Sequence, residues 1–271
     1  MRRDTVSGSP SLFLADDGPL RPPPLRWEAT EDGRRVLLRQ GGRPVLLAES
    51  DAYGRAATVR RRSGYRSPLA PLRVDEARRA PDWRHRFADE LVRSDRGPLH
   101  AGRWFVGRRA VFPPYVWRGD FVLDWPEARL EFDADGWNGV VPLRPPSAPD
   151  APRVSAYRRQ AREGVLPPVL LWWHRDFDGW LLLDGHDRAV AALAEGRDPE
   201  AVTLVRVPDE AALAREIAAV LDGAPPEADA GRLSEVVGSL PYDEIRNHTW
   251  PIPGGPAEWD AWMLEFRHEH D

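Results

Sequence analysis

The sequence has no cysteine and no lysine. Without cysteine the chain forms no disulfide and has no thiolate for nucleophilic, redox or zinc-binding chemistry. Without lysine it forms no Schiff base and has no Walker P-loop, which requires a phosphate-binding lysine. All 38 basic residues are arginine, which together with heavy use of alanine, glycine and proline indicates a GC-rich, bacterial genome. The same bias explains clusters such as Arg60–Arg62, which we expect to be solvated surface.

The sequence also has no long apolar run. No stretch approaches ~18 consecutive apolar residues, the minimum for a membrane-spanning helix, and the N-terminal residues lack the apolar segment of a secretory signal. The formal net charge is -5, so bulk charge gives no attraction to nucleic acids or anionic membranes. We therefore expect a cytoplasmic protein without a membrane partner, and DNA binding is the least favoured function.

Hydrophobic residues make up 42% of the 271 residues, and twelve residues are tryptophan. This composition predicts a folded chain with a substantial core. The order of the expected elements predicts an α+β class. Four regions are expected: a loose Pro-rich segment at 1–24, a β-rich, Trp-containing domain of unknown type at 25–138, a compact unit at 139–223 and an extension at 224–271.

The N-terminal half matches no known pattern beyond its local elements. These are a hairpin of strands at 35–39 and 44–48, a helix at 75–94, and short strands at 104–112, 121–125 and 129–132. In the C-terminal extension we expect a helix at about 256–267, because Trp259, Trp262, Met263 and Phe266 follow helical spacing. That stripe predicts a face docked on the core, and the last residues, 268–271, are expected to form a mobile tail rather than a metal site.

Residues 139–223 have a clearer pattern, β-α-β-β-α-β-α. The expected elements are strands at 140–143, 169–173, 180–183 and 202–207 and helices at 154–163, 189–195 and 208–221. The first strand is expected at a sheet edge because Pro142 lacks a donor. Gly164 suits the left-handed residue that ends a helix.

The run Asp184-Gly185-His186-Asp187-Arg188 joins a buried strand to a helix. The free N–H groups and the positive dipole end of a helix start favour an anion, and Arg188 is well shaped to hold a phosphate. A purely structural alternative fits the same residues. Asp184 would then be an ordinary N-cap, and the Asp184 and Asp187 carboxylates would neutralise His186 and Arg188.

The stretch Gly164-Val165-Leu166-Pro167-Pro168-Val169, the pair Gly179-Trp180 and the run from Leu183 to Ala192 resemble the ParB/sulfiredoxin superfamily. The resemblance covers residues 139–223. Members include CTP-dependent ParB clamps, sulfiredoxin and an ADP-dependent free-serine kinase, which share phosphate binding at this turn. The resemblance therefore implies a nucleotide ligand, ATP, ADP or CTP with Mg²⁺, or another phosphorylated small molecule.

Differences between this sequence and each of these members limit which activity the resemblance implies. His186 stands where sulfiredoxin has its catalytic cysteine, which excludes sulfinic acid repair. The chain lacks the Arg-rich run and the following helix-turn-helix of ParB. The DGH-x-R run of the serine-kinase branch is the most similar, but that branch needs a further carboxylate, for which Asp135, Asp150 and Glu163 are the candidates.

The resemblance suggests roles for the turn. The main chain of Gly185 to Arg188 would hold phosphates, Asp184 would hold Mg²⁺ or a substrate hydroxyl, and His186 would donate to a phosphate oxygen or transfer a proton. Ser147 would add a hydroxyl from the facing Pro-rich turn. Two functions follow: a phosphate-binding protein that acts as a Mg²⁺-dependent phosphotransferase or NTPase, or a non-catalytic regulatory module that binds a protein partner with a degenerate site.

Overall fold

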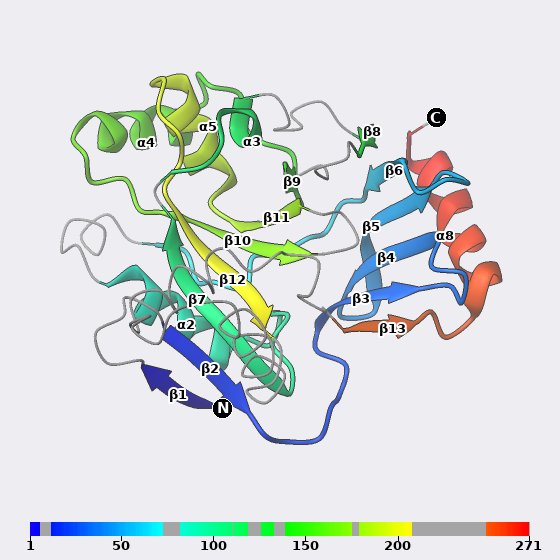
Figure 1. The fold of residues 1–271 in the computed structure, drawn as a ribbon. Coiled ribbons are helices and arrows are strands. Elements are labelled where there is room, and N and C mark those ends of the chain that lie inside the picture. Colours follow the sequence, from blue (N-terminus) through cyan, green and yellow to red (C-terminus); the bar gives the residue numbers. More distant parts are fainter. Residues whose placement is uncertain are drawn as a thin grey trace, which may run out of the picture.

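The computed structural model describes residues 1–5, 12–72, 82–109, 111–118, 126–132, 139–174, 179–207 and 248–270. These residues form two mixed β-sheets with helices on their outer faces, an α+β fold (Figure 1). Every helix in these ranges is too short or too polar to span a lipid bilayer.

The first sheet, sheet A, has seven strands. In spatial order they are β1 (Arg2–Thr5), β2 (Leu12–Asp16), β7 (Gly102–Arg109), β12 (Ala201–Val207), β10 (Val169–His174), β11 (Gly179–Asp184) and β9 (Val140–Pro142). The β10–β12 and β11–β9 pairs are parallel, and the other pairs are antiparallel. Because β9 lies at an edge, the sheet accommodates Pro142 without losing a ladder hydrogen bond, as the sequence predicted.

The second sheet, sheet B, has six strands. In spatial order they are β13 (Thr249–Pro251), β3 (Leu25–Ala29), β4 (Arg35–Gln40), β5 (Arg43–Ser50), β6 (Ala56–Arg61) and β8 (Glu127–Glu131). The predicted hairpin is β4–β5, which turns at Gly41 with a φ of 61°. β13 pairs in parallel with β3 and brings the C-terminal part of the chain to the edge of this sheet.

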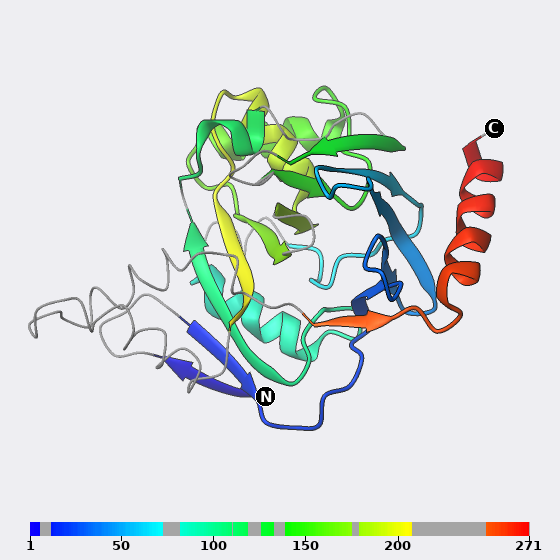
Figure 2. The same ribbon diagram turned by 45° about the vertical axis from the view of Figure 1, so that its right-hand side comes forward.

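The two sheets enclose the largest hydrophobic core. Alternate side chains from both sheets meet there, including Trp27 and Leu38 from sheet B and Trp104, Trp172 and Leu181 from sheet A. Helix α2 (Trp83–Arg93) adds Phe87 and Leu91 to the same core. Figure 2 shows the sheets facing each other with α2 closing one side.

The intervening side chains of sheet A point away from this core. Those of Leu171, Trp173 and Trp180 pack against the helical layer, to which Val154 and Ala189 belong. The layer consists of α3 (Pro114–Arg118), α4 (Pro152–Arg162) and α5 (His186–Ala194). The alternation of strand side chains therefore gives sheet A two buried faces.

Helix α8 (Gly255–His270) covers the outer face of sheet B. Its Trp259, Met263 and Phe266 pack on Leu37 and Leu47, so the predicted stripe is a docked face. The helix is longer than predicted and includes His268 to His270, which were expected to form a tail.

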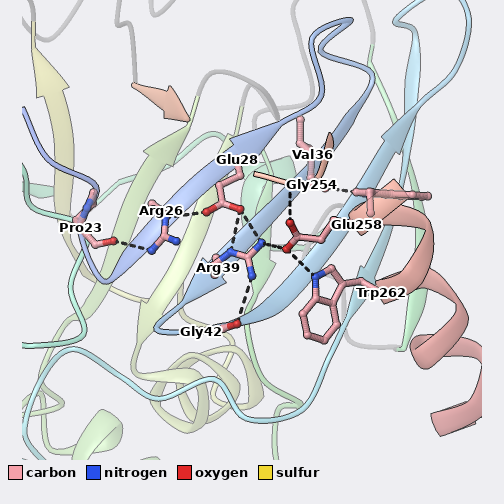
Figure 3. Close-up of polar contacts among 10 residues, drawn as sticks. Pro23, Arg26, Glu28, Val36, Arg39, Gly42, Gly254, Glu258 and Trp262 are labelled. Carbon is pink, nitrogen blue, oxygen red and sulfur yellow. Dashed lines mark hydrogen bonds and ion pairs between the residues drawn. The ribbon is translucent and has the colours of Figure 1, made fainter. Parts of the chain in front are cut away.

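Charged groups reinforce this docking. Arg39 is 6% exposed and bonds both Glu28, on β3, and Glu258, on α8, at 2.8 and 2.7 Å (Figure 3). Arg62 is 8% exposed and pairs with Glu265 and Glu269. The expectation that the Arg60–Arg62 cluster is solvated surface is therefore wrong for Arg62.

The N-terminal region differs most from expectation. Residues 1–24 were expected to be a loose segment, but they include β1 and β2, and Leu12 and Leu14 are fully buried. The expected boundary at residue 139 also does not separate two sheets, because β7 pairs with β12 from Arg109↔Ala201 to Arg103↔Val207.

Most of the remaining predicted helices and strands are found in the structure, and the others lie outside the described residues. The helix predicted at 75–94 is α2, and the strands predicted at 104–112 and 129–132 are β7 and β8. From 139 to 207 the predicted order holds as β9-α4-β10-β11-α5-β12, although α5 begins at His186 rather than 189. The expected strand at 121–125 and helix at 208–221 lie outside the described residues, as do residues 75–81.

Candidate anion-binding site at the strand–helix turn

The site is built on the turn from β11 to α5. Gly185 adopts a φ of 93° and a ψ of 22° and is the N-cap of α5, and no side-chain cap is found for this helix among the described residues. The alternative in which Asp184 is the N-cap is therefore wrong. A left-handed N-cap favours glycine because other residues are strained there.

Arg188 lies directly over this turn. Its Nη2 donates to Asp184 Oδ2 at 2.6 Å. Asp184 is the last residue of β11 and lies four positions earlier in the chain. Arg188 is only 4% exposed, and its buried Nε has no hydrogen-bond partner among the residues that the structure describes. A buried donor without a partner is unfavourable by roughly 1–3 kcal/mol, and an acceptor bound to this atom would remove that cost.

Arg188 also lines a pocket of about 110 Å³ between α5, the end of α4 and the start of β10 and β12. Apolar side chains form part of its wall, and Arg197, Asp198 and Glu200 supply charge. The lining residues are Ala161, Gly164, Leu166, Pro167, Val169, Arg188, Ala192, Arg197, Asp198, Pro199 and Glu200.

His186 points to the other side of the turn and is 1% exposed. Its Nε2 accepts hydrogen bonds from the main-chain N–H groups of Leu143 and Arg144 at 3.1 and 3.2 Å. An acceptor nitrogen is unprotonated, so the ring is neutral with its proton on Nδ1. Burial, together with the positive charges of Arg144, Arg61 and Arg188, lowers the pKa of His186 well below 6.5.

Asp187 is 3% exposed and holds the Pro-rich loop after β9 against the helix start. Its Oδ1 accepts from Ser147 Oγ at 2.9 Å, and its Oδ2 accepts from Arg144 Nη2 at 3.2 Å. Arg153, at the start of α4, pairs with the same Oδ2 at 3.4 Å. This carboxylate therefore has a structural function, since it joins the loop, α4 and α5.

Two groups from the N-terminal half reach the turn. Tyr65 is 8% exposed, and its hydroxyl donates to the Leu183 carbonyl at 2.8 Å, just before Asp184. Arg61 is 7% exposed, which contradicts the expectation of solvated surface, and burial lowers its pKa to about 10.

The structure thus brings together the predicted residues Asp184, Gly185, His186, Asp187, Arg188 and Ser147. Of the three candidates for a further carboxylate, Glu163 is the exposed C-cap of α4, Asp150 is exposed before α4, and Asp135 lies outside the described residues. Sequence reasoning missed Tyr65, because its partner is 118 residues away.

The expected Mg²⁺ at Asp184 does not fit this arrangement. Mg²⁺ is usually bound by one or two carboxylates that are free to face it. Here the Asp184 carboxylate is paired with Arg188 and Asp187 with Ser147, Arg144 and Arg153. Within the described part of the chain, no group of three or more His, Asp or Glu side chains is placed to hold a metal ion.

The fold and this turn define an α+β protein in which a left-handed glycine opens a helix beside a small arginine-lined pocket. Comparison with known proteins gives no further assignment, because no family model, no curated protein and no solved structure matches the chain.

Proposed function

We propose that the chain binds a phosphate group, carried by a nucleotide or another phosphorylated small molecule, in the pocket beside Arg188. The observation that supports this most is that Arg188 lines the pocket, while its Nε, which is shielded from solvent, has no partner among the described residues. A phosphate oxygen in the pocket would satisfy that donor once the guanidinium group turned its Nε toward it, and charge-assisted hydrogen bonds to arginine are among the stronger ones in proteins.

The size of the pocket limits how much of a ligand enters it. Pockets that enclose a drug-sized molecule span roughly 300–1,000 Å³, whereas this one has about 110 Å³. One phosphate group fits, and the remainder of a nucleotide would lie outside. Glu200, which also lines the pocket, is paired with Arg108, so its charge is partly offset for an incoming anion.

The proposal is for binding rather than for phosphoryl transfer. His186 Nε2 is occupied by two main-chain donors, and the Asp184 carboxylate is paired with Arg188. A Mg²⁺-dependent phosphotransferase or NTPase would need at least one of these groups to be released from its partner.

A second function, a regulatory module that binds a protein partner, is favoured by the burial of the turn. His186, Asp187 and Arg188 are 1%, 3% and 4% exposed, and most of their polar atoms are bonded within the chain. In this alternative the turn that resembles the ParB/sulfiredoxin superfamily does not bind phosphate and serves only to stabilise the fold.

Isothermal titration calorimetry distinguishes the two functions. The ligands are inorganic phosphate, ADP, ATP and CTP, each with and without Mg²⁺. Loss of one charged hydrogen bond is worth about 1.5–3 kcal/mol, so Arg188→Gln should raise the Kd at least tenfold. The matched control is Arg159→Gln on the exposed face of α4, which should leave the Kd unchanged. Absence of binding, or equal effects of the two variants, would contradict the proposal and favour the regulatory module.

A further inference from the structure

The strand–helix turn is held in place from outside the segment that carries it. The Tyr65 hydroxyl bonds the carbonyl of Leu183, the last residue before Asp184, at 2.8 Å. Tyr65 follows β6 of sheet B, whereas Leu183 lies in β11 of sheet A. This bond therefore connects the two sheets at the point where the chain enters the turn.

The environment of Tyr65 keeps this bond intact. The residue is 8% exposed, and its ring lies 6.3 Å from that of His186. Burial and the negative charge of Asp184 raise the pKa of Tyr65 well above 10. The phenol therefore remains protonated, and able to donate, at every pH at which the protein would ordinarily function.

Arg188 depends on the conformation of the same turn. Its guanidinium group lies 2.9–3.0 Å from the position of a β-carbon at Gly185 and bonds Asp184. Since no side-chain cap of α5 is found in the described ranges, tertiary contacts fix the helix start. Two of them lie on either side of Asp184: Tyr65 at Leu183 and His186 at Leu143 and Arg144.

We infer that Tyr65 is a positioning residue of the anion pocket: it fixes the end of β11 and so places Arg188 to bind the phosphate. The inference rests on the proposed function and assigns a role to the N-terminal half, because Tyr65 supports from outside a pocket whose lining residues all lie between Ala161 and Glu200. His186 supports the turn from the opposite side as a neutral acceptor.

The first test compares Tyr65→Phe with Thr203→Val. Both substitutions remove a buried hydroxyl that donates to a main-chain carbonyl, and Thr203 bonds Gly107 in sheet A at 3.5 Å. Hydrogen–deuterium exchange of the peptide covering residues 183–190 should become at least tenfold faster in Tyr65→Phe and remain unchanged in Thr203→Val. If Tyr65→Phe leaves this peptide as protected as in the wild type, the inference is wrong.

The second readout is the Kd for inorganic phosphate, which should rise several-fold in Tyr65→Phe and not in Thr203→Val. Equal losses in the two variants would show a general effect of stability and overturn the positioning role. If the wild type binds no phosphate, the proposed function fails, while the exchange experiment still tests whether Tyr65 holds the turn.

A third comparison uses His186. His186→Gln keeps a side-chain oxygen acceptor for Leu143 and Arg144, whereas His186→Leu does not. We expect phosphate affinity and exchange protection of residues 183–190 to be largely retained in the glutamine variant and lost in the leucine variant. Equal behaviour of the two would contradict the support assigned to His186.

Discussion

The guanidinium group of Arg188 lies within 3.0 Å of the position that a β-carbon at Gly185 would occupy. A β-carbon added to Gly185 would come within 2.9 Å of Arg188 Nη2 and 2.8 Å of Val169 Cγ1, closer than such carbons approach in proteins. Position 185 must therefore lack a side chain if Arg188 is to reach Asp184, so the glycine and the arginine depend on each other.

Gly185→Ala should accordingly destabilise the protein more than backbone strain alone explains. We expect a loss of about 3 kcal/mol, from a strained φ of 93° and a steric clash. The control is Gly196→Ala, which also has a positive φ, 68°, but no atom within 4 Å of the new carbon, and should lose about 1 kcal/mol. Urea denaturation measures both, and equal losses would show that Arg188 moves aside freely.

Arg39 should be far more important for stability than an exposed arginine in an ion pair. Arg39→Met leaves Glu28, which is 1% exposed, with one partner fewer, and breaking a buried pair costs about 3–5 kcal/mol. Arg108→Met removes a pair with Glu200 in which both side chains are about half exposed, worth ~0–1 kcal/mol. Free energies of unfolding from urea titrations test the contrast. Similar values would mean that Glu28 is satisfied by Arg26 alone.

Trp259 should anchor α8 to sheet B. Trp259→Ala removes a side chain that is 3% exposed and packs on Leu37 and Leu47, which is expected to cost about 3–5 kcal/mol. Leu264→Ala changes the same helix at a position that is 56% exposed and should cost under about 0.5 kcal/mol. Thermal and urea unfolding give both values, and a small effect of Trp259→Ala would show that the ion pairs alone hold the helix.

His100 should make stability fall in mild acid. Its pKa is lowered from 6.5 to about 4, first by burial and then by Arg206 and His248. The unfolded chain therefore binds the proton more readily, so the stability from His100 is fully present above pH 6.5 and is lost as the pH falls toward 4. One pKa unit corresponds to about 1.4 kcal/mol.

The measurement for His100 is the urea midpoint between pH 7 and 4 in the wild type and in His100→Asn. Asparagine retains a donor for the Pro98 carbonyl, which His100 Nδ1 contacts at 3.0 Å, but does not titrate. The variant should have a shallower pH dependence. An unchanged slope would show that His100 does not cause the acid sensitivity, and would leave it to other groups with lowered pKa values, such as His174 and His186, which are buried.

Features set by nearby residues were predictable from the sequence. Gly164 ends α4 with a φ of 71°, Gly185 lies between β11 and α5, and Pro142 lies in an edge strand, because each reflects the conformational limits of a single residue. The grouping of Ser147 with the Asp184–Arg188 turn was also predicted, since both flank neighbouring strands of one compact unit.

Features set by distant residues were not predictable. Leu12 and Leu14 belong to a five-residue strand whose local signal is weak, and their burial depends on pairing with β7, about 90 residues away. Arg61 and Arg62 resemble a solvated cluster in the sequence, but both are buried in the fold, and Arg62 pairs with Glu269 of α8. Tyr65 has no local motif, since its role depends on Leu183.

The parallel pairing of β13 with β3 has a consequence for how the chain folds during synthesis. Trp27 pairs with Thr249 and Ala29 with Pro251, so sheet B acquires this edge strand only after the long segment between β3 and β13 has been synthesised. Until then β3 offers an open row of backbone donors and acceptors, which is a template for strands of other chains. Such non-local pairing also slows folding. Nascent or C-terminally truncated chains should therefore be the aggregation-prone species, and β13 protects the strand of sheet B that it meets.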